Sequence, residues 1–309
     1  MPLKLQFPVY TLGRRQLLPP GATLTRETLG RLADSGRKGP VPTTSLLKFG
    51  TVRRDLLGFL RQDAYRVIFG DLRSNAALME LMESVRVSRP VLEILSYFRK
   101  NDLYTYRHVL RVFALSVFLA RNLESGHRDL VLEGAAGPLH DIGKICVPLP
   151  ILRKTTPLRR SERALLEHHA IAGYVLLSHY LKDFSRPAVK VALEHHERRD
   201  GSGYPRGIRL RNRLVEIVVA CDVYDALISA RPYRRDPYDN RTALEEMSEM
   251  ADRGSMDLGI VKALVSHNRK DRPDPRECKV SDERRGTPPD HNLYGLLLED
   301  ESPGGAVPA

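Results

Sequence analysis

The 309-residue sequence contains no tryptophan, only three cysteines, and fewer acidic than basic side chains. Cys146, Cys221 and Cys278 are odd in number and show neither a disulfide framework nor a CxxC spacing, so we expect reduced thiols in a cytoplasmic protein. The longest apolar stretches fall well short of the roughly 20 residues of a membrane helix. The segment Met1–Pro20 also lacks the apolar run of a signal peptide. We therefore expect no membrane partner.

The shortage of acidic residues leaves a formal net charge of +11, from 49 basic and 38 acidic side chains. A charge of this size favours anionic partners, which include nucleic acid, acidic lipid and small molecules that carry phosphate. The basic residues form no recognisable motif with interleaved aromatic residues, which argues against nucleic acid. With 42% hydrophobic residues, the chain can bury a sizeable core.

Residues 1–85 predict a small α+β domain with a regulatory or docking role. Three short apolar runs favour extended segments, and these are Leu5–Thr11, Ser45–Phe49 and Arg66–Phe69. A helical pattern covers Thr25–Ala33, and either Thr23 or Thr25 can cap its start.

From residue 86 to about residue 270 the pattern is helical, with apolar residues at spacings of three and four. The predicted helices are Pro90–Arg99, Tyr106–Leu123, Arg128–Leu139, Ser161–Tyr180, Arg186–His196, Arg213–Ser229 and Thr242–Asp252. The fold class is therefore mainly α, an all-helical bundle preceded by the small N-terminal domain. Residues 271–309 form a tail rich in proline and arginine, for which we expect weak order. Within this tail, the apolar cluster Leu293–Leu298 can dock on the body.

Seven side chains that can bind metals are distributed over five of the helical segments. They can converge only if the helices pack around one centre, as in bundles that build metal sites in their cores. These residues are His108, His140, Asp141, His169, His195, His196 and Asp222. The set contains no thiolate, which excludes a structural zinc finger, and its imidazoles and carboxylates suit iron, manganese, zinc or nickel. A carboxylate can bridge two metals, and Asp141 is the natural bridge because His140 is adjacent.

Further polar residues near these side chains point to an anionic ligand. The segment 195–207, HHERRDGSGYPRG, contains glycines followed by Tyr-Pro, which marks a tight turn beyond a helix end. Tyr204 in this turn can offer a ring face to a nucleobase. Lys144 lies one helical turn beyond His140, and Arg231 and Arg234 follow Asp222. Lysine and arginine side chains can bind phosphate groups. Taken singly, each of these cations is equally explained as a solvated surface residue.

These motifs together resemble the HD-GYP subgroup of the HD-domain phosphohydrolases. The resemblance rests on HDIGK from His140, the segment from His195, DVYDAL from Asp222 and RPYR from Arg231, and it covers roughly residues 100 to 268. It implies a helical HD-type domain that hydrolyses cyclic di-GMP, to pGpG or further to GMP. It also implies two or three bound metals, commonly iron or manganese.

The resemblance further implies a role for each matched residue. One metal would be bound by His108, His140, Asp141 and Asp222. The other would be bound by His169, His195, His196 and the bridging Asp141. Asp141 and Lys144 are the implied catalytic residues, and the implied phosphate contacts are Lys144, Arg231 and Arg234. The residues that shape the loop beside the site, which we call the GYP loop (residues 195–207), are Gly203, Tyr204 and Pro205.

Three positions refine this interpretation. His169 with Gly173 fits the spacing of the family, so His168 is expected to be an exposed helix residue. Tyr104 stands where some members carry a glutamate that helps to hold a third metal, so we expect two metals, iron first and manganese next. Ala230 replaces an acidic residue that often precedes the Arg-Pro pair, which alters the support of Arg231.

The mechanism implied by the resemblance is attack on one phosphorus by a hydroxide that bridges two metals. Two other hypotheses about the function stay open. The first is an HD phosphohydrolase for another nucleotide, such as cyclic GMP-AMP. The second is a sensor or scaffold module that binds a cyclic dinucleotide with little or no turnover. Besides cyclic di-GMP, we consider a signalling protein as a partner, docked on the N-terminal domain or on the GYP loop.

Overall fold

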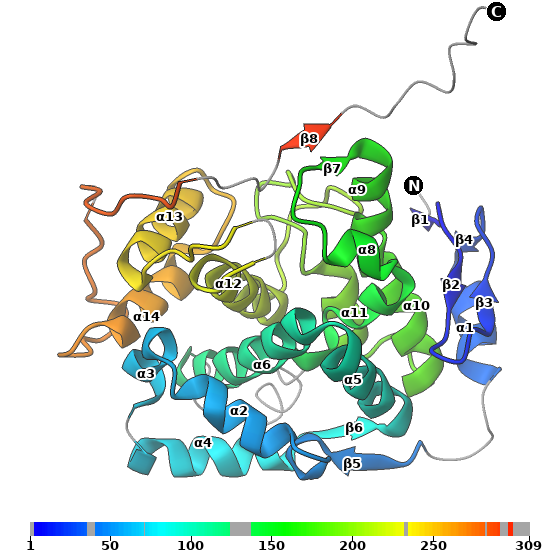
Figure 1. The fold of residues 1–309 in the computed structure, drawn as a ribbon, viewed down its shortest axis with the longest axis horizontal. Helices are drawn as coiled ribbons and strands as arrows, with labels where there is room; N and C mark the ends of the chain where they lie inside the picture. Colours follow the sequence, from blue (N-terminus) through cyan, green and yellow to red (C-terminus); the bar gives the residue numbers. More distant parts are fainter. Residues whose placement is uncertain are drawn as a thin grey trace, which may run out of the picture.

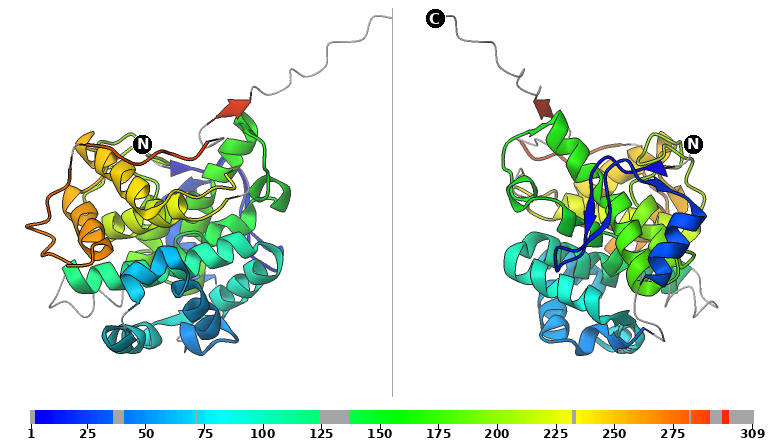
Figure 2. Two further views of the ribbon diagram at one scale, coloured as in Figure 1. Left: turned by 60° about the vertical axis from the view of Figure 1, so that its left-hand side comes forward. Right: turned by 90° about the vertical axis from the view of Figure 1, so that its right-hand side faces the viewer.

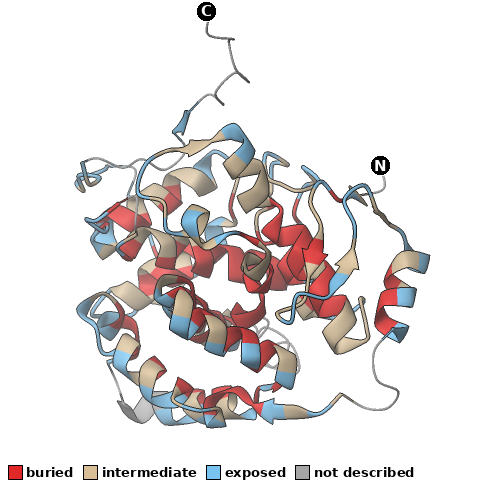
Figure 3. Cartoon of the chain, turned by 45° about the vertical axis from the view of Figure 1, so that its right-hand side comes forward, coloured by how far each residue is buried: buried red, intermediate tan, exposed pale blue. Residues whose placement is uncertain are grey.

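The computed structural model describes residues 3–35, 41–70, 72–123, 137–231, 234–281, 283–290 and 296–298. Its architecture confirms the predicted mainly helical fold with a small strand-containing region at the N-terminus (Figure 1). The middle of the molecule consists of helices α6 (Leu103–Leu123), α10 (His169–Leu181), α11 (Pro187–Glu194) and α12 (Arg213–Ile228). Buried residues are concentrated in these helices (Figure 3).

The central helices lie in the core because they are apolar on nearly all faces. In α6, buried residues run almost without a break from Thr105 to Ala120, and α12 is buried to a similar extent. A helix that is hydrophobic all round needs neighbours on every side, whereas a surface helix needs only one apolar stripe. The side chain of Asn212 starts α12 by accepting a hydrogen bond from the Val215 amide at 3.1 Å. Helices α6 and α12 pack directly on each other, and α10 packs on α11.

Further helices of the helical region surround these four. They are α5 (Arg89–Asn101), α8 (Leu149–Leu152), α9 (Arg160–Glu167), α13 (Asn240–Asp252), α14 (Leu258–Asn268) and the 3₁₀ helices η2 (Gly137–Leu139) and η3 (Ile142–Cys146). The helix predicted over Ser161–Tyr180 is divided into α9 and α10 at His168. Of the helix predicted over Arg128–Leu139, residues 128–136 lie outside the described residues.

The N-terminal region contains short strands and four helices. The strands are β1 (Leu3–Lys4), β2 (Val9–Tyr10), β3 (Gln16–Leu18), β4 (Thr23–Leu24), β5 (Thr43–Ser45) and β6 (Arg86–Ser88). They pair antiparallel, β1 with β4, β2 with β3 and β5 with β6. The helices are α1 (Arg26–Asp34), α2 (Val52–Leu60), α3 (Asp63–Phe69) and α4 (Leu72–Ser84), with the 3₁₀ helix η1 (Leu46–Lys48) before α2.

Two predictions for this region have clear outcomes. Thr25 caps α1, because its hydroxyl oxygen accepts a hydrogen bond from the Thr28 amide at 3.1 Å. The extended segment predicted at Arg66–Phe69 is wrong, since these residues belong to α3. The buried side chains of α3 are Tyr65, Ile68 and Phe69. Ile68 and Phe69 follow Tyr65 by three and four residues, so both lie on the helix face of Tyr65.

The N-terminal region packs on the helical body in two places. Residues 3–35, which we call the N-terminal unit, place Leu5, Val9 and Leu29 against the apolar residues of α10. This unit lies beside α10 on the right of Figure 1 and crosses the helical body in the right-hand view of Figure 2. Helices α2 to α4 instead share the main core, which extends from Leu46 to Leu264. The domain boundary predicted at residue 85 therefore falls within a continuous core.

The described end of the C-terminal tail docks on the body, as predicted for its apolar cluster. Strand β8 (Leu297–Leu298) pairs in parallel with β7 (Leu158–Arg159). Earlier in the tail, the backbone amides of Arg285 and Gly286 donate hydrogen bonds to Glu245 of α13 at 3.1 and 2.8 Å. No helix in the described part of the chain is both long enough and apolar enough to cross a lipid bilayer.

Candidate metal centre and substrate cavity

The structure brings the seven predicted metal ligands together at one end of the central helices. His108 lies on α6 and Asp222 on α12, whereas His169 is the first residue of α10. The pair His140-Asp141 lies between η2 and η3, and the pair His195-His196 follows α11. Possible ligand atoms lie within 4.8 Å of one another in each of two groups, one formed by His108, His140 and Asp222, the other by His169, His195 and His196.

Asp141 lies between the two groups and faces both. Its Oδ2 atom is 3.6 Å from Nε2 of His108 and 3.4 Å from Nε2 of His140. Its Oδ1 atom is 3.3 Å from Nε2 of His169 and 3.8 Å from Nε2 of His195. One carboxylate oxygen thus points to each histidine group, which is the arrangement that a bridging carboxylate requires.

Backbone carbonyls fix the orientation of the imidazole rings. Nδ1 of His169 donates to the Leu166 carbonyl at 2.6 Å, and Nδ1 of His195 donates to the Ala192 carbonyl at 3.0 Å. With the ring proton on Nδ1, each Nε2 presents a lone pair. The Nε2 atoms of His169 and His195 face each other at 3.1 Å, where two lone pairs repel unless a cation lies between them. The donor set therefore fits divalent metal ions.

Burial keeps most of these ligands in the form that binds metals. It lowers the pKa of His169 to about 4 and the pKa of His195 and His196 well below the usual value, so these imidazoles are neutral. Burial by itself raises the pKa of Asp141, but the charge of Lys144 and the adjacent His140 side chain outweigh it and hold that pKa well below its usual value. Burial also lowers the pKa of His108, but its hydrogen bonds to Asp222 and Asp225 outweigh burial and raise that pKa to about 9. One histidine group is therefore neutral and faces an ionised carboxylate, whereas His108 holds a proton that a metal would have to displace.

Asp225 is a functional residue that the sequence analysis did not assign. Its carboxylate is fully buried and accepts a hydrogen bond from Nδ1 of His108 at 2.7 Å. The Tyr65 hydroxyl donates to the other oxygen of the same carboxylate. Asp225 follows Asp222 by three residues on α12 and so lies on the same helix face, which is the signal that could have identified it. A carboxylate in this place sets the tautomer of a metal-binding histidine and strengthens it as a ligand.

We expect Asp225→Asn to lower the affinity for metal by about 10- to 100-fold, the usual effect of losing such a partner. The amide lacks the charge that favours a proton on Nδ1 of His108, so Nε2 becomes a weaker ligand. Manganese titration of the metal-free protein measures the effect. The matched control is Tyr65→Phe, which removes the second hydrogen bond to Asp225 and leaves its charge in place. Equal affinities in Asp225→Asn and the parent protein would contradict this role.

A cavity opens directly beside the metal centre. It is lined by His169 and His196 and by three of the predicted substrate-binding residues, Lys144, Tyr204 and Arg231. Nζ of Lys144 lies 2.5 Å from Oδ2 of Asp141. Lining residues that the sequence analysis did not place beside a substrate include Tyr104, Lys154, Arg163, Leu296 and Leu297. The docked end of the C-terminal tail thus forms part of the cavity wall.

Aromatic rings connect this cavity to the metal ligands. The Tyr204 ring stacks on His196 with ring centroids 4.5 Å apart, and the Tyr104 ring stacks on His108 at 5.9 Å. The guanidinium of Arg231 lies over the Tyr104 ring, 5.3 Å from its centroid. Tyr104 therefore supports both a metal ligand and a cavity arginine.

Two residues lie elsewhere than the sequence suggested. Arg234 is 4% exposed and donates hydrogen bonds to the carbonyls of Leu227 and Ser229 at 2.7 and 3.2 Å, so it closes the end of α12. It is not among the residues that line the cavity, and its contact with phosphate stays a prediction. The expected exposure of His168 is wrong, because its ring is 4% exposed and packs edge-on against Phe7 of the N-terminal unit at 5.4 Å.

Close backbone contacts hold the GYP loop against the metal centre. A Cβ atom on Gly203 would lie 2.2 Å from the His196 carbonyl oxygen, so only glycine fits there. Glu197 is fully buried, and its two oxygens accept hydrogen bonds from the amides of Arg206 and Ile208 at 2.8 and 3.0 Å. The Glu197 carboxylate thus connects the end of the GYP loop to its start, directly after His196.

We expect Glu197→Gln to lower the free energy of unfolding by about 1–3 kcal/mol, because the amide can accept only one of the two loop hydrogen bonds and leaves a buried N–H without an acceptor. Denaturant titration measures the loss, and hydrogen exchange should accelerate at the amides of Arg206 and Ile208. The control is Glu27→Gln, at an exposed ion pair of α1 with a separation of 3.8 Å, where no measurable change is expected. Unchanged exchange in the loop would contradict the role of Glu197.

Comparisons with known proteins show which family the chain resembles. Residues 94–260, more than half of the chain, match the family model of the HD domain. The cyclic di-GMP phosphodiesterase PA4108 of Pseudomonas aeruginosa is 35% identical over 238 residues, which cover 74% of this chain and 56% of that protein. A cyclic di-GMP phosphodiesterase of Thermotoga maritima is 37% identical over 164 residues, 52% of this chain and 44% of its own length.

A further relative is named for a different cyclic dinucleotide. It is the 3′3′-cGAMP-specific phosphodiesterase 2 of Vibrio cholerae, which is 33% identical over 168 residues, 53% of this chain and 31% of that protein. The chain thus spans between about a third and just over half of the length of these curated relatives.

Proposed function

Because the chain belongs to the HD-domain family, in its HD-GYP subgroup, we propose that it is a metal-dependent phosphodiesterase that hydrolyses cyclic di-GMP to pGpG. The observation that carries this proposal is the position of Asp141, which directs one oxygen to each of two histidine groups. A binuclear site of this kind beside a cavity with cationic walls suits the attack of water on a phosphodiester.

The residues present define where two metals would be held. One group is His108, His140 and Asp222, the other is His169, His195 and His196, and Asp141 is shared. Iron is our first expectation and manganese the second, since both accept imidazole and carboxylate ligands. When bound, two divalent ions lower the pKa of water and neutralise charge on the phosphoryl oxygens.

The side chains of the cavity bind and orient the substrate. The Lys144 ammonium and the Arg231 guanidinium supply positive charge at the mouth of the metal centre, where the charge on a phosphoryl group increases in the transition state. Lys144 also keeps Asp141 ionised through their close contact. Tyr204 is fixed by its stacking on His196, so it offers a rigid ring at the cavity for a nucleobase.

A second candidate substrate is 3′3′-cGAMP, for which the Vibrio cholerae relative is named. The cavity residues named above act on phosphates and on base faces, and such contacts do not distinguish guanine from adenine. The hypothesis of a sensor module with little or no turnover has less support, because the described residues retain every expected metal ligand and Lys144 beside them.

The test is hydrolysis by the full chain, purified without oxygen and loaded with iron or manganese. We expect pGpG from cyclic di-GMP, measured by chromatography, and 3′3′-cGAMP is assayed in parallel as the second candidate substrate. Lys144→Met should lower kcat by about 10²–10³, the usual effect of losing one charge-stabilising donor. Arg234→Gln, in contrast, should lower stability more than kcat, because Arg234 binds carbonyls at the end of α12. Bound metals without turnover of either nucleotide would overturn the proposal.

A further inference from the structure

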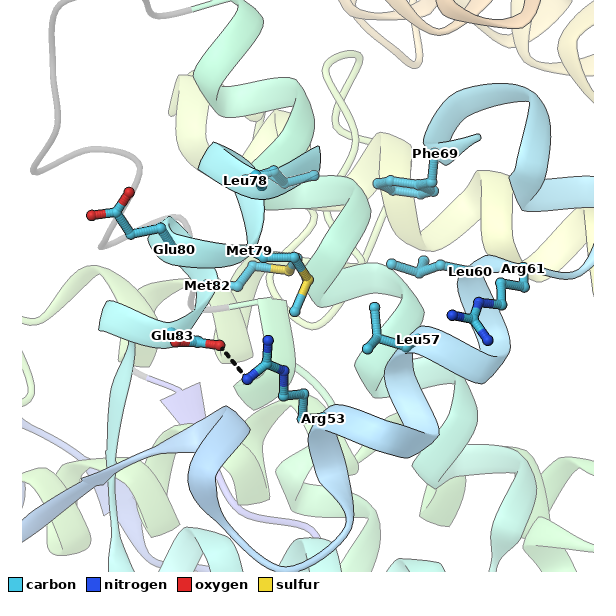
Figure 4. A pocket seen from close by; sticks show the side chains of 11 residues that line it. Arg53, Leu57, Leu60, Arg61, Phe69, Leu78, Met79, Glu80, Met82 and Glu83 are labelled. Carbon is cyan, nitrogen blue, oxygen red and sulfur yellow. Dashed lines mark ion pairs between the residues drawn. The ribbon is translucent and has the colours of Figure 1, made fainter. Parts of the chain in front are cut away.

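A second cavity lies away from the metal centre, between helices α2, α3 and α4 (Figure 4). Its volume is about 360 Å³, at the small end of the range for small-molecule sites. Leu57, Leu60 and Phe69 line it from α2 and α3, and Met79 and Met82 line it from α4. Nothing in the proposed hydrolysis uses this space.

The walls of this cavity are apolar and adaptable. Leu60, Phe69 and Met82 are at most 7% exposed, yet they border open space. The two methionines have flexible, polarisable side chains that adjust to the shape of an apolar ligand. The cavity therefore suits the hydrocarbon part of a small molecule.

The rim of the cavity carries two arginines, Arg53 and Arg61, and two glutamates, Glu80 and Glu83. Arg53 forms an ion pair with Glu83 at 3.0 Å, which balances that arginine. Arg61 lies beside Leu57 and Leu60, whereas the carboxylate of Glu80 points away from them (Figure 4). Arg61 forms no ion pair within the described residues, so it leaves a cation at the mouth of an apolar space. A carboxylate is the complement of such a guanidinium.

The segment that joins α2 to α3 also connects this cavity to the metal centre. Gln62 follows Arg61 and accepts a hydrogen bond from Arg111 of α6 at 2.5 Å. Tyr65, one turn further, donates its hydroxyl to Asp225. Asp225 in turn holds the metal ligand His108 at 2.7 Å. A shift of α3 caused by a bound ligand would therefore reach His108 through two side chains.

We propose that this cavity binds a small amphipathic carboxylic acid, with its hydrocarbon part between α2, α3 and α4 and its carboxylate on Arg61. We further infer that occupation changes the metal affinity at His108 through Tyr65 and Asp225. The site itself is independent of the proposed hydrolysis, whereas its coupling rests on the metal centre.

Calorimetry of the full chain with octanoate, and with uncharged octanol as the comparison ligand, tests the site. We expect Arg61→Gln to weaken octanoate binding about tenfold, the effect of losing one charge-assisted hydrogen bond, and to leave octanol unchanged. The matched control Arg54→Gln, on α2 but outside this cavity, should leave the binding of both ligands unchanged. Leu57→Trp should abolish binding of both ligands by filling the cavity. If the tryptophan impairs folding, Met79→Phe is used to fill the cavity instead. No binding of octanoate, or equal binding after either filling substitution, would overturn the site.

Manganese titration with and without octanoate tests the coupling. The parent protein should show a change in metal affinity of about fivefold or more, the lower range of coupling between sites. Tyr65→Phe should still bind octanoate but lose this change, because it cannot donate to Asp225. An equal change in Tyr65→Phe, or none in the parent protein, would overturn the coupling. If the chain does not bind manganese, both the proposed metal centre and the coupling are wrong. The calorimetry would still show whether the cavity binds the carboxylic acid.

Discussion

Asp141→Ala is expected to remove both bound metals together and to abolish measurable hydrolysis. Asp141 is the only residue of the described site whose two ligand atoms face the two histidine groups separately, at 3.3–3.8 Å from four Nε2 atoms. Without this carboxylate the imidazoles lose the negative charge that offsets two divalent ions, in a site with little water to screen them. A residue that served only one metal would leave the other bound.

Metal content per chain, measured after loading with manganese and gel filtration, gives the direct readout. We expect close to two ions in the parent protein and none in Asp141→Ala. Asp222→Ala should retain the ion held by the other histidine group, because Asp222 belongs to the His108 group and its Oδ1 atom lies 3.1 Å from Nε2 of His108. The control Asp236→Ala, at an exposed position, should bind as the parent does. Two ions retained in Asp141→Ala, with normal turnover, would refute the bridging role.

The candidate site was predictable because its ligands are of rare chemical types that the sequence displays directly. Adjacent pairs such as His140-Asp141 and His195-His196 predict a metal site before any fold is known. The partner of His108 was harder to predict, because the hydrogen bonds to Asp225 and from Tyr65 join residues 117 and 160 positions apart in the chain. Such contacts depend on how α3, α6 and α12 pack, and no local pattern encodes that packing.

The same physical reason accounts for the wrong predictions in the N-terminal region and at His168. The apolar run at residues 67–69 satisfies either a strand or one helix face, and packing on the main core selects the helix α3. His168 was expected to be exposed because its neighbour His169 fits the ligand spacing of the family, and Phe7, far away in the sequence, covers it. Helix periodicity thus predicted the elements of the body well, because those helices carry their own apolar faces. It did not predict which surfaces the N-terminal unit would cover.

Gly143→Ala should be the most damaging substitution that leaves every metal ligand in place. A Cβ atom at residue 143 would lie 1.9 Å from the carbonyl oxygen of His169 and 2.4 Å from the amide nitrogen of Gly173. Both atoms belong to the backbone of α10, so no side chain can rotate away and η3 must move from α10. We expect a loss of about 3 kcal/mol or more in the free energy of unfolding, at the upper end for overpacking. The shift would also separate Asp141 from His169, and a displacement of about 1 Å can cost about 10²-fold in rate.

Two other glycines provide a graded comparison for this prediction. Gly173→Ala brings the new atom only to 3.4 Å from Ala192 and Gly143, a contact that small movements relieve, so a milder loss is expected. Gly58→Ala, on α2, meets nothing within 4 Å and should stabilise the protein by up to about 1 kcal/mol through helix propensity. Denaturant unfolding of the three metal-free variants separates packing from ligand chemistry, and manganese content then reports the position of His169. If Gly143→Ala retained the stability of Gly58→Ala, then η3 and α10 would not lie in the close contact on which the geometry of Asp141 depends.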